Sequence, residues 1–185
     1  MALFGDGLEA AVQKAFTRPV PKSAGVQMRY LVRRLKGTRP VAGLLGITQR
    51  TVERYVKNEI KKPRPELAAR LECEVRKRWQ PQIRAEARRR AATTGGIVID
   101  TRARIGYTAP VGTTDDARVR HLTVALPPQH AARLFDAQQA GAGEQRLRQI
   151  TAEGLKEVYF QEGGRRAGAL EEIRFMDVEQ IEFEL

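Results

Sequence analysis

The chain has 185 residues, 42% of them hydrophobic, which is enough for one or two small domains with packed cores. Its single cysteine, Cys73, excludes a disulfide framework and any multi-thiolate zinc site, and no segment approaches the roughly 18 unbroken apolar residues of a membrane span. The formal net charge is +11, and because the opening MALFGDGLEA lacks the basic and apolar regions of a signal peptide, we expect an intracellular protein.

The charge is distributed unevenly along the chain. Residues 1–92 contain 22 basic and 8 acidic side chains, a net charge of +14, whereas residues 93–185 contain 11 basic and 14 acidic ones, a net charge of −3. Basic residues that neutralise phosphates release condensed counterions, so they bind a polyanion in a salt-dependent way. The split predicts a basic DNA-binding domain over residues 1–92 and a second domain over residues 93–185. A basic surface that serves only solubility is the alternative.

Two amphipathic helices are predicted in the first part of the chain. Apolar residues recur at helical spacing over residues 3–16, and Pro19 and Pro21 would end this helix. Ser23 is placed to cap a second helix, which exposes its arginines and stops at Gly37. The core-facing stripe of the second helix consists of Met28, Leu31, Val32 and Leu35.

The segment TRPVAGLLGITQRTVERYVKN, residues 38–58, has the spacing of a helix-turn-helix unit. Ala42 is small enough for the two helices to cross closely, Gly46 supplies a left-handed turn, and Val52 packs the second helix onto the first. Thr48 is placed to cap the second helix, which would be the recognition helix. A helical hairpin without a role in DNA binding is the alternative, and the basic surroundings of the segment favour DNA binding.

Polar and basic side chains occupy the positions of this segment that would reach base edges or phosphates. The candidate DNA-binding residues are Arg39, Thr48, Gln49, Arg50, Thr51, Arg54 and Lys57. Glu53 shares the exposed face, and Tyr55 fits either the core or a phosphate contact.

A long helix is predicted after the basic turn KKPRP at residues 61–65. Its apolar stripe consists of Leu67, Leu71, Val75, Trp79 and Ile83. Pro81 should kink or end this helix, because proline removes a backbone donor and clashes with the preceding turn. We assign Trp79 to the core rather than to a base-stacking surface. The final turns contain Arg84, Arg88, Arg89 and Arg90. These arginines could equally well contact the DNA backbone or form a face exposed to solvent.

Helical periodicity gives way to a period of two at Thr93-Thr94-Gly95-Gly96, which marks the expected domain boundary. Beyond it we expect strands near residues 97–107, 122–126 and 171–185, and helices over residues 128–140 and from about 144 to Gly163-Gly164. In the tail, Ile173, Phe175, Ile181, Phe183 and Leu185 share one parity. The chain is therefore predicted to be α+β, with an all-helical helix-turn-helix domain followed by a small antiparallel sheet with packed helices.

The sequence lacks a Walker loop, a dinucleotide-binding fingerprint and a G-x-S-x-G turn. His121 and His130 have no neighbouring thiolates, so we expect neither to ligate a metal. The segment TAPVGTTDD, residues 108–116, connects two predicted strands and places two hydroxyls and two carboxylates after Gly112. A hydroxyl there could be offered to another enzyme whose metal ions promote phosphoryl transfer, but residue chemistry alone favours an ordinary polar loop.

The sequence resembles the terminal proteins that cap the telomeres of linear actinobacterial chromosomes and plasmids. The resemblance covers essentially the whole chain, and its carriers are MALFGDGLEAAVQKAFTRPVPKSAG, VAGLLGITQRTVERYVKN, LAARLECEVRKRWQPQIRAEARRRAATTGG and YTAPVGTTDDARVR. In that family a threonine hydroxyl replaces the sugar 3′-OH as primer, and the protein stays covalently attached to the DNA 5′ end. The family's partners are a telomere-associated protein, which binds the single-stranded 3′ overhang, and a cellular DNA polymerase.

The resemblance implies a protein primer rather than an enzyme, which reverses the preference for an ordinary loop. It places the priming hydroxyl on Thr114, with Thr113 as second choice, and we expect Gly112, Asp115 and Asp116 to support it. The protein would need no cofactor of its own, because the divalent metal and the deoxynucleotide come with the polymerase. The expected partners are telomeric DNA, the telomere-associated protein and the polymerase, at the nucleoid and chromosome ends and not at a membrane; a homo-oligomer is compatible with this role.

Two other classes stay open on the residues alone. A helix-turn-helix transcriptional repressor with a dimerising second domain would have the same charge split, and it would bind palindromic operators. A recombinase or relaxase would use Tyr107 or Tyr159 as its nucleophile, but neither tyrosine is accompanied by clustered arginines and histidines.

Overall fold

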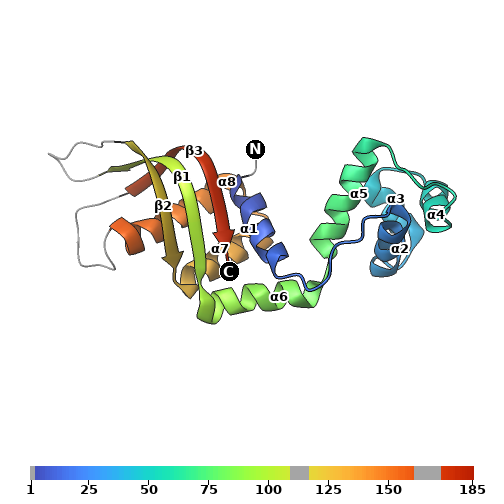
Figure 1. The fold of residues 1–185 in the computed structure, drawn as a ribbon, viewed down its shortest axis with the longest axis horizontal. Coiled ribbons are helices and arrows are strands. Elements are labelled where there is room, and N and C mark those ends of the chain that lie inside the picture. The colour runs from blue at the N-terminus through green and yellow to red at the C-terminus, as the bar shows by residue number, and fades with distance from the viewer. Residues whose placement is uncertain (1–2, 109–116, 161–171) are drawn as a thin grey trace. The chain divides into compact units, whose positions relative to one another are not determined.

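The computed structural model describes residues 3–108, 117–160 and 172–185, and it confirms the α+β class (Figure 1). The chain divides into two compact units. One consists of Met1–Phe16 and Gln82–Leu185 and contains the antiparallel sheet, so we call it the sheet unit; the other, Thr17–Pro81, is the helical unit. Among the helices in the described ranges, none is long and apolar enough to cross a membrane.

This division differs from the predicted boundary at residue 92. The helix α1 (Leu3–Lys14) forms as predicted, but Phe4 and Leu8 are buried in the core of the sheet unit. The helix α6 (Pro81–Arg90) also belongs to that unit, apart from its first residue. An apolar stripe shows that a helix buries one face, but it does not show which core receives that face.

The helical unit consists of α2 (Ala24–Arg34), α3 (Thr38–Leu45), α4 (Gln49–Val56) and α5 (Pro65–Arg78). Both predicted N-caps are confirmed, because Ser23 Oγ accepts from the Val26 amide at 3.4 Å and Thr48 Oγ1 accepts from the Thr51 amide at 3.2 Å. The end of α2 differs from the prediction: Lys36, with φ of 58°, takes the left-handed conformation, and Gly37 is extended.

The predicted break at Pro81 is confirmed. The helix α5 ends at Arg78, Trp79 is extended, and Gln80 has φ of 44° before α6 begins. Proline cannot donate the backbone hydrogen bond that would continue α5, so the helix does not extend through this position.

The sheet has three antiparallel strands in the order β2-β1-β3, with bounds β1 (Ile97–Thr108), β2 (Arg118–Leu126) and β3 (Glu172–Glu184). The predicted alternation of β1 is confirmed, because Ile97, Ile99 and the residues of the same parity as far as Ile105 are buried. The strands β1 and β2 form a hairpin whose pairing extends to Ile105 and Arg118.

The strand β3 keeps its predicted parity only because it contains two bulges. Met176 and Glu179 have no partner in the register with β1, so each adds one residue to β3. The first bulge moves Val178 to the core side and the second restores the original parity, so that Phe175 and Ile181 are both buried. Leu185 follows the end of β3 and is 45% exposed, unlike the buried residues with which it was grouped.

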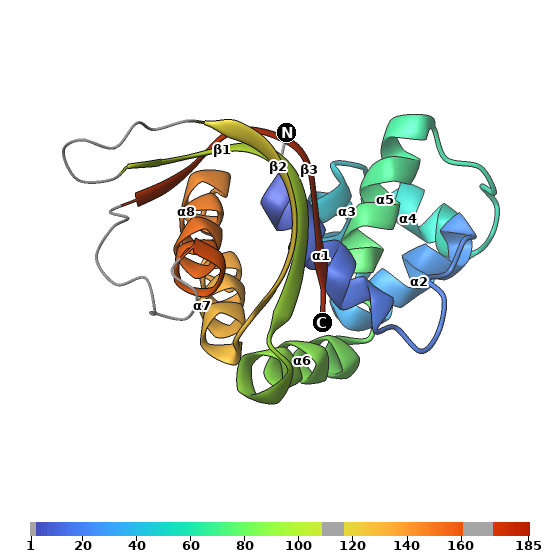
Figure 2. The same cartoon turned by 60° about the vertical axis from the view of Figure 1, so that its left-hand side comes forward.

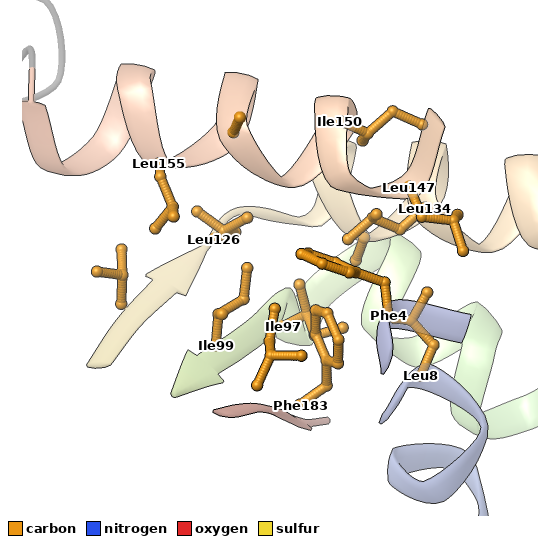
Figure 3. Packing of buried hydrophobic residues seen from close by; sticks show 14 of the residues in the cluster. Phe4, Leu8, Ile97, Ile99, Leu126, Leu134, Leu147, Ile150, Leu155 and Phe183 are labelled. Atoms are coloured by element: carbon orange, nitrogen blue, oxygen red, sulfur yellow. The ribbon is translucent and has the colours of Figure 1, made fainter. Parts of the chain in front are cut away.

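Two further helices, α7 (Pro128–Gln139) and α8 (Glu144–Leu155), lie on one face of the sheet (Figure 2). The chain continues from α8 in the π-helical turn η2 (Lys156–Phe160), and the predicted stop at Gly163-Gly164 lies outside the described residues. Apolar side chains from α1, α7, α8 and the strands form one core, in which Phe4 points toward α8 and the sheet (Figure 3). Phe4 contacts Phe175 edge to face at a centroid distance of 5.6 Å.

Charged hydrogen bonds hold α1 against the rest of the sheet unit. The Glu144 carboxylate accepts from the amides of Phe4 and Gly5 at 2.9 and 2.8 Å, which satisfies donors that have no partner inside α1. The guanidinium of Arg84, on α6, donates to both carboxylate oxygens of Glu9 at 2.6 Å. Burial raises the pKa of Glu9, but hydrogen bonds from Arg84 and Gln13 and nearby positive charge outweigh it and lower the pKa below 4.5.

The Glu9–Arg84 pair makes the stability of the sheet unit depend on pH. Because the pKa of Glu9 is lower when folded, its stabilisation is complete above the ordinary pKa of about 4.5 and is lost as pH falls through the folded pKa. Glu9→Gln should lower the free energy of unfolding by about 2 kcal/mol at pH 7 and flatten its decline below pH 4.5. Urea unfolding at several pH values measures both effects. Glu86→Gln, which alters an exposed pair with Arg89, should change the free energy little; an equal effect of the two substitutions would contradict this account.

Gly96 is required where η1 (Ala91–Gly95) joins β1. Its φ is +71°, and a Cβ there would lie 2.2 Å from the carbonyl oxygen of Leu126. Gly96→Ala should therefore cost at least about 2 kcal/mol in urea unfolding, since it adds a backbone clash to a strained conformation. Gly141 is a matched control, because it also has positive φ but open space around its Cβ position. Gly141→Ala should cost about 1 kcal/mol, and equal costs would show that the close approach at Gly96 is unimportant.

Candidate nucleic-acid interface

The α3–α4 pair has the predicted helix-turn-helix geometry. Gly46 is left-handed, with φ of 62° and ψ of 39°, and the Ile47 amide donates to the Ala42 carbonyl at 3.0 Å to close the turn. Val52 and Tyr55 of α4 are buried in the core of the helical unit. The structure thus resolves the ambiguity of Tyr55 in favour of the core, and burial raises the pKa of its hydroxyl against the nearby charges of Arg54 and Arg64.

The position of α4 against α2 depends on a close approach at Gly25. A Cβ on Gly25 would lie 2.3 Å from Asn58 Oδ1 and 3.1 Å from the Tyr55 carbonyl oxygen. One turn later, the Arg29 guanidinium donates to the Val56 carbonyl at 3.0 Å and to Asn58 Oδ1 at 3.1 Å. A cation there satisfies a free carbonyl and interacts favourably with the helix dipole. Arg29, predicted to face outward with the other arginines of α2, instead donates hydrogen bonds at the end of α4.

The packing of Val52 and Tyr55 turns the opposite face of α4 to solvent. Of the seven candidate DNA-binding residues, Thr51 is half-buried, and the exposed ones are Arg39, Thr48, Gln49, Arg50, Arg54 and Lys57. All except Arg39 lie on α4 or at its two caps, whereas Arg39 lies in the first turn of α3. The candidates are therefore concentrated on the exposed side of one short helix, which is the arrangement that groove contacts require.

Several of these side chains contact their neighbours. The Thr48 and Thr51 hydroxyls are 2.8 Å apart, Gln49 Nε2 donates to Glu53 at 2.9 Å, and Arg54 Nε pairs with Glu59 at 3.3 Å. Arg39, Arg50 and Lys57 form no side-chain ion pair within the helical unit, all of which the structure describes. These three cations are available to phosphates without breaking an existing pair.

The excess of positive charge lies in a shorter part of the chain than the predicted domain of residues 1–92. The helical unit contains 17 basic and 5 acidic residues, so its net charge is +12, and the remaining residues carry a net charge of −1. With α1 and α6 in the sheet unit, the entire excess of positive charge lies within the 65 residues of the helical unit. Such a concentration on a helix-turn-helix unit fits a polyanionic partner.

The predicted priming residues Gly112, Thr113, Thr114, Asp115 and Asp116 lie outside the described residues. The strands on either side of this segment are described, since β1 ends at Thr108 and β2 begins at Arg118.

The two histidines have different surroundings and different partners. His121 is exposed on β2 with Nε2 3.3 Å from Asp100, whereas His130 is buried on α7 with Nε2 2.9 Å from Glu157. Within the described ranges, no three His, Cys, Asp or Glu side chains are grouped so that they could hold a metal ion. Tyr159, a candidate nucleophile of the recombinase alternative, stacks edge to face on Phe160 at 4.9 Å.

Comparison of the chain with protein-family models, with curated proteins and with solved structures found no match.

Contacts from the exposed face of α4 should be measurable as DNA affinity. Replacing Arg50 and Lys57 by alanine should weaken duplex binding by about 1–3 kcal/mol and reduce the log-log salt slope by about one unit for each lost phosphate contact. Fluorescence anisotropy of labelled duplex over a salt series gives both quantities. Arg76→Ala, on α5, is the control, because Arg76 is exposed in the same unit but pairs with Glu72. Equal effects of the double variant and the control would place the contact surface elsewhere.

Proposed function

We propose that the protein is a DNA-binding protein primer of the telomere terminal-protein type. In this proposal the helical unit binds the DNA end through α4, and the segment 109–116 of the sheet unit offers a threonine hydroxyl to a DNA polymerase. The protein is the substrate of the polymerase and not itself a catalyst.

The observation that carries the DNA-binding half is the exposed face of α4. A short helix, capped by Thr48 and fixed by Gly46, presents Gln49, Arg50 and Lys57 from a unit with a net charge of +12. Glutamine and arginine can pair with base edges in the major groove, and lysine neutralises phosphate. The same features fit a repressor, so they support DNA binding without choosing between the two functions.

The priming half rests on the resemblance of the sequence to terminal proteins and on the chemistry of YTAPVGTTDDARVR. In the proposed step, Thr114 Oγ attacks the α-phosphorus of a deoxynucleoside triphosphate. A phosphorus–oxygen bond to threonine forms, the bond between the α-phosphorus and the bridging oxygen breaks, pyrophosphate leaves, and the hydroxyl proton passes to solvent. The polymerase supplies the divalent metal ions that stabilise the developing charge.

A labelling reaction tests the priming step and its assigned residue. The full-length protein, incubated with polymerase, telomeric template, the telomere-associated protein and a labelled deoxynucleotide, should acquire label that survives denaturation. Thr114→Ala should abolish labelling, because alanine has no hydroxyl, and Thr114→Ser should retain part of it. Gel electrophoresis with autoradiography measures the adduct.

Thr113→Ala is the matched control, since it removes a neighbouring hydroxyl of the same kind. If Thr113→Ala abolishes labelling and Thr114→Ala does not, the assignment to Thr114 is wrong. A footprint with two half-sites about one helical turn apart, together with no label on any variant, would instead favour the repressor.

A further inference from the structure

A shallow groove on the helical unit lies outside the α4 face described above. Its volume is about 400 Å³, and its lining residues are Pro21, Val26, Tyr30, Arg33, Arg34 and Trp79. Pockets for small organic groups span about 300–1,000 Å³, so this groove is large enough to hold a nucleobase and part of its sugar.

The groove follows a second stripe of α2. Met28 and Leu31 face the core, whereas Val26, Tyr30 and the pair Arg33-Arg34 recur at the i, i+4 and i+7/i+8 positions of another face. Val26 is 38% exposed although it is apolar. This helix therefore presents an apolar and aromatic strip that ends in two arginines.

Trp79, which we expected in the core, is partly buried against it, and its ring also lines the groove. Long-range hydrogen bonds fix this aromatic wall. Trp79 Nε1 donates to the Arg18 carbonyl at 3.0 Å, and the Tyr30 hydroxyl donates to the Arg78 carbonyl. The two rings meet edge to face with centroids 5.0 Å apart. Because the polar atoms of both rings bond the backbone, the two rings contribute aromatic rather than hydrogen-bonding surface to the groove.

The segment that brings Arg18 beside Trp79 is itself held in place. The Thr17 amide donates to Gln80 Oε1, and Gln80 Nε2 donates to Thr17 Oγ1, both at 3.0 Å. The groove is thus formed before any ligand binds, which reduces the ordering cost of binding.

The charge at the mouth of the groove identifies the class of ligand. Arg33 and Arg34 are exposed and form no ion pair within the helical unit. In that unit Glu59, Glu72 and Glu74 pair with other cations, and Glu53 accepts a hydrogen bond from Gln49. Adjacent arginines beside an aromatic wall match a phosphate next to an unstacked base. Duplex DNA does not fit, because its bases are stacked and paired.

We propose that this groove binds single-stranded DNA, with a base against Trp79 and Tyr30 and the neighbouring phosphates on Arg33 and Arg34. The site is separate from the duplex contacts of α4 and does not rest on the priming step.

The single tryptophan of the chain is a reporter inside the groove. Titrating the full-length protein with an oligothymidylate of about 12 nucleotides should quench Trp79 emission, because stacked bases quench indole fluorescence. Arg33→Ala combined with Arg34→Ala should weaken binding about 10-fold or more and lower the log-log salt slope by up to about 1.4. These two side chains are exposed and form no ion pair within the helical unit, so the variant should keep the circular dichroism and unfolding midpoint of the wild type.

Lys61→Ala combined with Lys62→Ala is the matched control, since it removes the same charge from exposed positions of the same unit. The control should bind oligothymidylate within about twofold of the wild type. Binding without quenching of Trp79, or an equal loss in the two double variants, would overturn the groove assignment. The Arg50/Lys57 variant separates the two sites: it should lose duplex affinity but keep the quenching, so failure of the α4 assignment and failure of the groove are distinguishable.

Discussion

The close crossing of α2 and α4 at Gly25 is the constraint on which the helical unit depends. A Cβ there would lie 3.1 Å from the Tyr55 carbonyl oxygen and would displace the Asn58 side chain, so glycine suits the close approach of the two helices. That packing buries Val52 and Tyr55, and their burial forces Arg50 and Lys57 outward. Arg29 then donates to the Val56 carbonyl at the end of α4. The close approach of α2 and α4 thus positions the proposed recognition face. Of the arginines of α2, Arg29 supports α4, whereas Arg33 and Arg34 are exposed.

The sheet unit obeys a different constraint, in which α1 must be held against a core built mostly from the other end of the chain. Glu144 caps the start of α1, and Arg84 on α6 holds Glu9 near its middle. Both helices lie within the basic residues 1–92 of the sequence but belong to the sheet unit. As a result the two units differ in charge and content. The helical unit contains the excess of positive charge, and the nearly neutral sheet unit contains the hairpin that flanks the proposed priming segment.

The local features of this protein could be predicted from the sequence, because they depend on neighbouring residues. Thr48 as a cap, Gly46 as a left-handed turn and the break before Pro81 all follow from short-range chemistry. The core against which α1 packs could not be predicted from the sequence, since the apolar stripe of Phe4 and Leu8 fits any apolar core. The two bulges of β3 could not be predicted either, because two extra residues leave the overall alternation of the strand unchanged. The groove required long-range contacts that place Trp79 beside α2.

The central claim is that one protein both binds the DNA end and becomes its covalent primer. It is tested most directly by mass spectrometry of the protein released by exhaustive nuclease digestion from linear DNA of the cells that make it. We expect the peptide containing Thr113 and Thr114 to carry one deoxynucleoside monophosphate, with fragmentation placing it on Thr114. An unmodified peptide, or a nucleotide on a residue outside the segment 109–116, would contradict the account.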